Sequence, residues 1–408
     1  MAISRLLKRK WKSLDWTQVF LVSILISIGL TALYSIEFQQ AGIDKSFFAR
    51  QVIWSLSGII AFFIAFFIPQ KVLFNFAYVF YGFALLLLIT TAFIGSGSVS
   101  RWIMIGSVGL QSSEFMKIAL IIAIARYFAD HKIQLRHWKE FIPPILLTLV
   151  PVILVLIQPD LGTSLVFVGL LFIVIFWGGI YPLNYFLLIS PLISMIAVFN
   201  VTAFFIWMAI FVLVLAVSKP PIIWTIGNFI LNIGVGGLTS LMWDFLKPYQ
   251  QNRILSLFKP ELDPLGSGYQ LSQSLTAFGS GGVYGKGFGQ GTQTHLKFLP
   301  EQHSDFIMTV IGEEFGFASV IFVILLLTYL IARMIYFAGE NKYRFNSMML
   351  LGGASILFLH SLVNLGMIVG LLPVTGIPLP FISYGGSFLL TAMIIVGLAA
   401  NMISNDRM

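Results

Sequence analysis

The chain has 408 residues, of which 58% are hydrophobic and only 10% are charged, and its formal net charge is +8. Its mean hydropathy is +0.94. A soluble domain carries about 25% charged residues, so this composition excludes a soluble protein. It predicts an all-α polytopic membrane protein, because helices satisfy their own backbone hydrogen bonds within lipid. The alternating pattern of a membrane β-barrel is absent. Because the chain has no cysteine, disulfides, thiolate metal sites and cysteine nucleophiles are excluded.

Apolar segments of about 20 residues, the length that spans a bilayer, follow one another along the chain. The first runs from about Thr17 to Ile36. It is too long for a signal h-region and shows no convincing small-residue cleavage site, so we expect an uncleaved span. With it, about twelve spans are expected, and the others begin near Gln51, Val72, Ser112, Phe141, Leu161, Pro182, Val201, Ile222, Phe306, Phe345 and Tyr384. Residues 161–241 are almost continuously apolar, and their division into four spans depends on breaks at Gly178-Gly179, Asn200 and Lys219-Pro220-Pro221.

Lys and Arg residues in short connections indicate the cytoplasmic side of a membrane. They gather at the N-terminus (Arg5, Lys8, Arg9, Lys10, Lys12), in the connection 126–139 (Arg126, Lys132, Arg136, Lys139) and in the connection 333–344 (Arg333, Lys342, Arg344). Counting spans from a cytoplasmic N-terminus places all three inside and residues 244–305 outside. The positive charge therefore reports topology, and no nucleic-acid partner is expected. We expect a single membrane domain over residues 1–408, with residues 244–305 as its large extracytoplasmic loop.

The stretch Glu261–Asp305 is polar within an otherwise apolar chain. Connections of about 60 residues are uncommon and are either functional or disordered, and the aromatic residues spread through this one favour an ordered, functional loop. Seven glycines between Gly279 and Gly291 predict a closely approached backbone. They are not a nucleotide-binding fingerprint, because no strand precedes them.

The loop ends in Glu301, His303 and Asp305, directly before the apolar run that starts at Phe306. A carboxylate in this position is partly desolvated and is placed to act as a general base on a hydroxyl at the membrane surface. The spacing leaves an alternative equally open, in which Ser304 or Asp305 only caps the helix that follows.

Ionisable residues inside a span are costly and usually pair or mark a pathway. Glu114 and Lys117 are three residues apart and share a helix face, so they form either a functional pair or a self-neutralising anchor. Glu313 and Glu314 are adjacent, and at least one of them is expected to face an interior cavity. A lone histidine in a span, such as His360, is more often structural than a ligand.

Three further polar positions lie at the predicted outer side. Arg101 offers a bidentate fork for a phosphate, or anchors the chain at the interface. Asp160 either caps the next helix or forms a wall of a site. The Pro- and Gly-rich residues 376–387, which include Ser383, resemble a re-entrant segment, which is tolerated at membrane depth only where it is buried or lines a cavity. Together these patches predict an outward-opening polar chamber for an amphiphilic substrate with a phosphate and a polar head.

Four separated motifs read, in order, SSEFMK, QPDLGTS, DPLGSGYQLSQSLTAFGSGGVYGKGFGQGTQTHLKFLPEQHSDFI and GIPLPFISYGGS. Together they resemble the SEDS family (shape, elongation, division, sporulation) of bacterial cell-wall proteins. The long motif is closer to RodA, the elongation member, than to FtsW, the division member. The family usually has ten spans, so the twelve expected here include a surplus pair, which we assign to residues 184–245.

The resemblance implies a peptidoglycan glycosyltransferase that polymerises lipid II on the outer face of the bacterial cytoplasmic (inner) membrane. It implies that Asp305 is a general base on the acceptor sugar hydroxyl and that undecaprenyl pyrophosphate leaves with inversion. The family's Glu, Lys and Arg correspond to Glu114, Lys117 and Arg101. The complete set of expected substrate-binding residues is Arg101, Glu114, Lys117, Asp160, Glu301, His303 and Ser383.

Cationic groups or a divalent cation, Mg²⁺ or Mn²⁺, would stabilise the departing pyrophosphate. The partners that the resemblance implies are lipid II and nascent glycan, a class B penicillin-binding protein (a transpeptidase), elongation-complex proteins such as MreC and MreD, and membrane lipids. Three alternatives stay open: an FtsW-like division paralogue, a lipid II flippase or transporter that uses Glu114 and Lys117, and a scaffold for the transpeptidase.

Overall fold

The computed structural model describes residues 10–38, 47–94, 101–105, 108–130, 138–243, 248–257, 261, 263, 266–295 and 298–406. Twelve helices within them are 16 residues or longer: α2 (Trp16–Phe38), α3 (Phe47–Phe67), α5 (Ala77–Ile94), α6 (Ser112–Asp130), α7 (Ile142–Ile157), α8 (Leu161–Trp177), α9 (Pro182–Ala197), α10 (Val201–Ser218), α11 (Ile222–Trp243), α15 (Ile307–Glu340), α16 (Arg344–Ile368) and α17 (Gly386–Asp406). Each lies on one expected span. Seven of them are long and apolar enough to cross a membrane, and the chain is a multi-pass, all-α membrane protein.

The apolar region 161–241 divides into four helices at the expected breaks. Helix α8 ends against Gly178, and Gly179 has a φ of 89°. The side chain of Asn200 accepts a hydrogen bond from the amide of Ala203 and so caps α10. Lys219, in a left-handed conformation, ends α10 before the two prolines that precede α11. The predicted division of this region into four segments is confirmed, and each break has its own local stop or start signal.

The third expected span begins later than the sequence indicated. A short helix α4 (Gln70–Asn75) precedes α5, and the two are separated at Phe76. Pro69 stands directly before α4, where its missing amide proton is not needed. The hydropathy pattern does not show this break, because only Asn75 separates the apolar residues 72–74 of α4 from the apolar residues that begin at Phe76.

The shorter elements lie in the connections. A 3₁₀ turn η2 (Trp138–Glu140) precedes α7, and strands β1 (Trp102–Ile105) and β2 (Val108–Gln111) pair antiparallel, with Trp102 opposite Gln111. The connection 244–305 contains α12 (Pro248–Leu255), α13 (Ser267–Gly281) and α14 (Thr292–His295). The predicted order of this loop is confirmed for the part that is described. The basic residues expected on the cytoplasmic side at positions 5, 8, 9, 132 and 136 lie outside the described residues.

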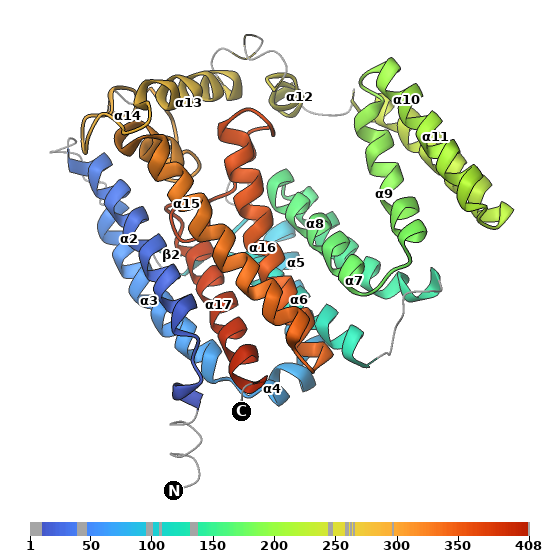
Figure 1. Ribbon diagram of the computed structural model, residues 1–408, viewed down its shortest axis with the longest axis horizontal. Coiled ribbons are helices and arrows are strands. Elements are labelled where there is room, and N and C mark those ends of the chain that lie inside the picture. The colour runs from blue at the N-terminus through green and yellow to red at the C-terminus, as the bar shows by residue number, and fades with distance from the viewer. Residues whose placement is uncertain are drawn as a thin grey trace, which may run out of the picture.

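Helix α16 packs against α15, α6, α8 and α17, and α17 also packs against α3. Figure 1 shows both termini at the lower end of this bundle and α13 across the opposite end. Helices α16 and α17 are the most buried of the seven long spans. Protein rather than lipid surrounds them, which is why buried polar groups are tolerated there.

Helices α9, α10 and α11 stand apart from the other helices (Figure 1) and follow α8 through residues 178–181. Their buried apolar cluster, formed by Leu187, Phe211 and Leu215, is separate from the main core. The surplus pair of spans assigned to residues 184–245 therefore lies in a subgroup of helices with little core of its own.

The glycine-rich loop after α13 lies directly on the backbone of α15. The amides of Lys286 and Gly287 donate to the carbonyls of Glu313 and Glu314 at 3.0 and 2.9 Å. Gly316 has a φ of 80°, which interrupts the helical geometry of α15. A Cβ on Gly285 or Gly316 would collide with the backbone of the other segment. The predicted close approach of the glycine run is confirmed.

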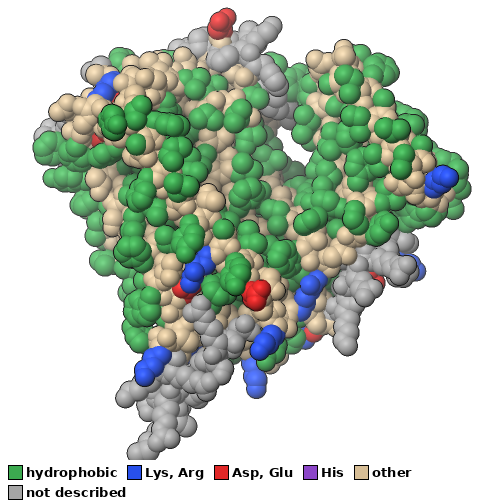
Figure 2. Space-filling model, viewed as in Figure 1, with side chains coloured by type: hydrophobic (Ala, Val, Ile, Leu, Met, Phe, Trp, Pro, Cys, Tyr) green, Lys and Arg blue, Asp and Glu red, His purple; other side chains and the backbone are tan. Residues whose placement is uncertain are grey.

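Figure 2 shows hydrophobic side chains over the flanks of the molecule, with Lys and Arg side chains gathered mainly toward its lower end. In Figure 1 this is the end where the two termini lie. Such a band of apolar surface is typical of helices that face lipid.

Candidate active site

The chain between α16 and α17 returns into the bundle without regular helix (Figure 1). We call residues 374–385 the re-entrant segment. Its residues Leu379, Phe381 and Ile382 are buried, which confirms the re-entrant prediction. The hydroxyl of Ser383 accepts a hydrogen bond from the amide of Leu379 at 2.8 Å, and Gln51 of α3 donates to the carbonyl of Ser383 at 3.1 Å. Ser383 therefore closes a turn inside the segment.

Neighbouring helices hold the outer half of this segment by its backbone. The side-chain amide of Asn364 on α16 donates to the carbonyls of Ile377 and Asp305 at 2.8 and 2.9 Å. Gly162 at the start of α8 approaches so closely that a Cβ would lie 3.1 Å from the carbonyl oxygen of Thr375. The re-entrant segment is therefore in contact with the start of α8, and Asn364 links it to the end of the long loop.

Asp305 lies at the end of that loop, two residues before α15. The residue in the cap position of α15 is Phe306, with no side-chain hydrogen bond to the helix, so the capping alternative for Ser304 and Asp305 is not what the structure shows. An Oδ2 atom of Asp305 faces Gly376, where a Cβ would lie 3.3 Å away. Gly376 has a φ of 76°.

The pKa of Asp305 is raised from 3.8 to about 6, chiefly by burial and next by the nearby charge of Glu301, while the hydrogen bond with Ser304 and the charge of Arg253 act in the opposite direction. A carboxyl group with such a pKa is a stronger base than an ordinary aspartate and is still mostly ionised at pH 7. This is the perturbation expected of a general base.

His303 and Glu301 lie beside Asp305 in sequence and make contacts of their own. The ring of His303 stacks on Phe47 with centroids 4.0 Å apart, and its Nε2 lies 3.6 Å from a carboxylate oxygen of Glu301. The carbonyl of His303 accepts from the amide of Tyr384 at 2.9 Å. The loop end is thereby tied to both α3 and the re-entrant segment, while the Glu301 side chain is 60% exposed and reaches outward.

Glu114 and Lys117 form a buried ion pair in α6, with the Lys117 Nζ 2.6 Å from Glu114 Oε1. The same Nζ lies 3.0 Å from Nε2 of His360 on α16, and Nδ1 of His360 lies 3.2 Å from the carbonyl oxygen of Pro378. The pair is fully inside the protein, and the other Glu114 oxygen has no partner among the described residues. The ion pair is therefore linked through His360 to the re-entrant segment.

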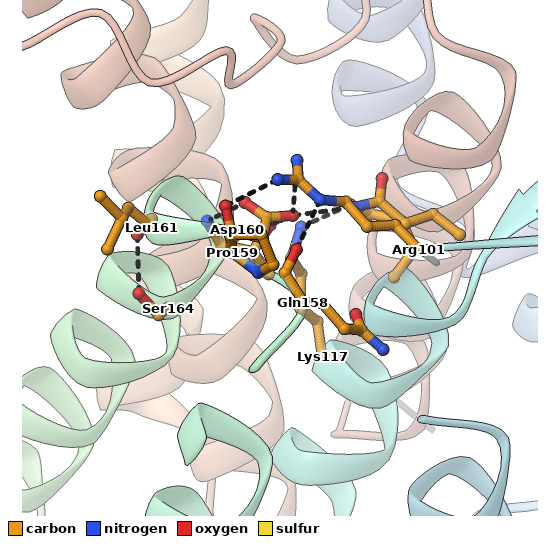
Figure 3. Close-up of polar contacts among 10 residues, drawn as sticks. Arg101, Lys117, Gln158, Pro159, Asp160, Leu161 and Ser164 are labelled. Atoms are coloured by element: carbon orange, nitrogen blue, oxygen red, sulfur yellow. Dashed lines mark hydrogen bonds and ion pairs between the residues drawn. The ribbon is translucent and has the colours of Figure 1, made fainter. Parts of the chain in front are cut away.

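Arg101 and Asp160 meet at the start of α8 (Figure 3). Asp160 caps α8, because it accepts from the amide of Thr163 at 3.1 Å, as the capping interpretation predicted. Arg101 donates to the carbonyls of Gln158 and Pro159 at 2.9 and 2.6 Å, and its Nη1 lies 3.8 Å from Asp160. The Arg101 side chain is 36% exposed, so part of its fork reaches solvent.

Comparison with known proteins identifies the family. A profile of the FtsW/RodA/SpoVE family, described as cell cycle proteins, matches residues 15–208 and 196–408. The chain belongs to this family. Peptidoglycan glycosyltransferase MrdB of Escherichia coli K12 is 33% identical over 402 residues, which are 97% of each protein. RodA of Treponema pallidum is 30% identical over 423 residues, with 94% of this chain and 96% of the relative covered. The resemblance to the SEDS proteins is confirmed.

Solved structures agree with this assignment to the FtsW/RodA/SpoVE family. The chain superposes on a protein from a peptidoglycan synthase complex that coordinates polymerization and crosslinking, with a TM-score of 0.70, 28% identity and coverage of 96% and 98%. It superposes on the rod shape determining protein RodA of Thermus thermophilus with a TM-score of 0.63, 26% identity and coverage of 97% and 98%. The two profile matches overlap at residues 196–208, within the region to which the surplus pair was assigned.

Glu313 and Glu314, of which at least one was expected to face an interior cavity, are held by polar groups of the protein itself. Both are buried. Glu313 accepts hydrogen bonds from Lys286 at 2.7 Å and from the amides of Gln293 and Thr294 at 3.0 and 3.1 Å, so it pins the glycine-rich loop. The loop itself supplies the polar partners that the sequence could not assign to these acids.

Sequence reasoning missed the glutamines that position the site. Gln51 holds the re-entrant segment, Gln111 donates to Asp160 at 3.2 Å, and Gln158 donates to Thr91 at 2.9 Å. For Gln51, an amide side chain within an apolar helix was the available signal, because a buried amide needs partners. Within the described residues, no three or more His, Asp or Glu side chains form a group that could hold a metal. The expected contacts of the seven substrate-binding residues with substrate stay predictions.

Proposed function

We propose that this chain is a peptidoglycan glycosyltransferase that polymerises lipid II into glycan strands during cell elongation, in the manner of the relatives named MrdB and RodA. The observation that carries the proposal is Asp305. Its carboxyl group is partly buried, has a pKa raised to about 6 and faces the glycine of the re-entrant segment.

In this proposal, Asp305 takes the proton from a hydroxyl of the acceptor sugar. The hydroxyl oxygen attacks the anomeric carbon of the donor, the bond to the pyrophosphate oxygen breaks, and undecaprenyl pyrophosphate leaves with inversion. A base whose pKa lies near the working pH combines the ionised form with a strong affinity for the proton. Glu301 and His303 would contact the sugar, since they flank Asp305 at the loop end.

The departing pyrophosphate needs cationic partners. Arg101 suits this role better than Lys117, because part of its fork is exposed, whereas Lys117 is buried and neutralised by Glu114. Lys117 and Glu114 would then act indirectly, by holding the re-entrant segment through His360. Asp160 would keep the guanidinium of Arg101 in place. Ser383 would act through the turn that it closes.

A divalent cation, Mg²⁺ or Mn²⁺, would add charge stabilisation to the leaving group. The described residues supply two neighbouring carboxylates, Glu301 and Asp305, rather than a group of three ligands. We therefore propose that such a cation would arrive with the substrate's pyrophosphate. Titration of the purified protein with Mn²⁺ in the absence of lipid II, followed by electron paramagnetic resonance, should then show only weak binding.

The same proposal includes location and partners. The protein would lie in the cytoplasmic (inner) membrane as one domain over residues 1–408, with the N-terminus inside and the loop 244–305 outside. Its partners would be lipid II, nascent glycan, a class B penicillin-binding protein and elongation proteins such as MreC and MreD. Support comes from the Lys and Arg side chains toward the lower end of the molecule in Figure 2, the end at which α17 finishes in Figure 1, and from the relative solved in a synthase complex.

The test uses purified protein in liposomes with labelled lipid II. We expect glycan strands from the native protein and none from Asp305→Asn, which keeps the shape of the side chain but cannot accept the proton as a base. Asp263→Asn is the matched control, because Asp263 lies in the same connection and its side chain accepts hydrogen bonds from Ser267 at the start of α13. Equal polymerisation by Asp305→Asn would overturn the proposal.

A transporter is the second candidate, because the buried Glu114–Lys117–His360 cluster resembles the intramembrane ionisable groups of transporters. A lipid-flipping assay in the same liposomes separates the two. A transporter moves labelled lipid II across the bilayer without lengthening glycan, and Asp305→Asn would leave that movement intact. An FtsW-like division role would instead be indicated by rescue of division-deficient rather than elongation-deficient cells.

A further inference from the structure

A groove of about 1350 Å³ separates the α9–α11 subgroup from the bundle. Its walls come from α7, α9 and α11, and they are mainly apolar, with Ile145, Leu187, Leu188 and Leu231 among the lining residues. Ligand sites are usually about 300–1,000 Å³, so the groove has room for something longer than a compact solute. Its apolar walls suit acyl chains.

A second, smaller hollow of about 350 Å³ adjoins the groove. It lies around the connection from α15 to α16 and is lined by Trp177, Gly339, Asn341, Lys342, Arg344 and Ser347. Arg344 lines both hollows. Among the described residues that line either hollow there is no Asp or Glu, so the charged side chains of the lining are the cations Lys342 and Arg344.

Arg344 is held at this junction by a hydrogen bond from its Nη2 to the carbonyl of Gly178, at 2.9 Å. A guanidinium has five N–H donors in a rigid fork, and this bond uses one of them. The side chain is thereby oriented while donors are left for an anion. Lys342, two residues earlier, is exposed and adds a second cation at the mouth.

We propose that the groove and the polar hollow together bind one anionic glycerophospholipid. Its phosphate would lie between Arg344 and Lys342, and its acyl chains would run between α7, α9 and α11. A purely apolar occupant would not require the cationic hollow, and a soluble phosphate would not require the groove. The combination, with Arg344 shared between the two, matches a molecule that has both parts.

The location supports this ligand. The connection that carries Lys342 and Arg344 lies at the same end of the bundle as the two termini (Figure 1), and Lys219 and Pro220 stand at the corresponding end of the α10–α11 hairpin. Basic residues near a membrane surface attract anionic lipids. The bound lipid would also fill the space beside α9–α11, whose own buried cluster is small, and so hold this subgroup against the bundle.

The experiment uses the full-length protein, purified in mild detergent, with native mass spectrometry after addition of phosphatidylglycerol or phosphatidylcholine. We expect one tightly retained phosphatidylglycerol per protein and about tenfold weaker retention of phosphatidylcholine, because each Lys or Arg near the phosphate favours the anionic lipid several-fold. Equal retention of the two lipids would overturn the proposal.

Variants locate the site. Lys342→Gln and Arg344→Gln should each reduce phosphatidylglycerol retention several-fold, whereas Lys71→Gln, an exposed lysine on α4, should not. Because Arg344→Gln also removes the bond to Gly178, a second pair tests the groove without changing charge: Leu188→Trp on its wall and Leu325→Trp on the exposed face of α15. Loss of binding in Leu188→Trp alone is expected, and retention there would contradict the proposal.

A soluble competitor distinguishes a lipid from a free phosphate. Glycerol phosphate carries the same anionic group without acyl chains, and we expect it not to displace the lipid at millimolar concentration. Displacement as effective as that by added phosphatidylglycerol would mean that the groove contributes nothing, and the proposal would fall. Glycan polymerisation is measured separately, so the outcome does not depend on the activity proposed above.

Discussion

The Nε2 atom of His360 lies 3.0 Å from the Nζ atom of Lys117. An ammonium group has donors and no acceptor, so Nε2 must accept, and the ring proton must be on Nδ1. That proton is donated to the carbonyl of Pro378, 3.2 Å away. A neutral His360 therefore joins the ion pair of α6 to the re-entrant segment that lies against Asp305.

Replacing His360 tests this link. His360→Ala would leave the buried Lys117 with one acceptor fewer and the Pro378 carbonyl without its donor, which costs about 1–3 kcal/mol for each lost partner. We expect a lower thermal unfolding temperature and a lower kcat with a small change in KM, because His360 positions the segment without touching substrate. His360→Gln, which offers both an acceptor and a donor, should recover part of both losses. Unchanged stability and kcat in the alanine variant would contradict the link.

The rate of polymerisation should depend on pH through Asp305. Its pKa is raised to about 6, so the ionised, basic form is lost as pH falls below that value. We expect the rate to rise with pH and to reach half its plateau near pH 6, measured with labelled lipid II at constant ionic strength. A profile that is flat between pH 5 and 7 would argue against Asp305 as the base.

Two neighbouring charges should move that profile in opposite directions. Glu301 raises the pKa of Asp305 and Arg253 lowers it. Glu301→Gln should therefore shift the acidic limb of the profile to lower pH, and Arg253→Gln should shift it to higher pH. The paired design removes the effect of a general loss of activity, since only the midpoint is compared. Shifts in the same direction would show that another group titrates.

The glycine-rich loop should tolerate a side chain at one glycine and not at another. Gly285 has a φ of 81° and its backbone touches that of Glu314, whereas Gly279 has open space around it. Gly285→Ala should cost about 1–3 kcal/mol in backbone strain alone, with loss of the contact to α15. Gly279→Ala should change stability little. Thermal unfolding and protease sensitivity of the loop measure both, and equal behaviour would contradict the close approach.

Glu313 should be needed for the same loop to stay in place. Glu313→Gln weakens the bonds from Lys286 and two backbone amides, and we expect a loss of about 1–3 kcal/mol in local stability. Hydrogen exchange in residues 282–292 is the measurement. Glu261→Gln, at an exposed position of the same connection, is the control and should leave the exchange rates unchanged.

The sequence by itself determined the helices of this protein. Twelve apolar segments are also helices, and the breaks at Gly179, Asn200 and Lys219 occur where local backbone chemistry requires them. Lipid exposure and chain geometry act over a few residues, which is why hydropathy and turn residues are enough to predict them. Asp305 could be singled out for the same reason, since a carboxylate between a polar loop and an apolar helix is visible in the sequence.

Only the tertiary structure decided what the polar side chains do. It turned Glu313 into an anchor for the loop, joined Lys117 to His360 across 243 positions of the chain, and closed Ser383 into a turn. Each of these depends on which donors and acceptors from distant segments meet in a buried space where water cannot satisfy them. These long-range contacts cannot be predicted from the local sequence.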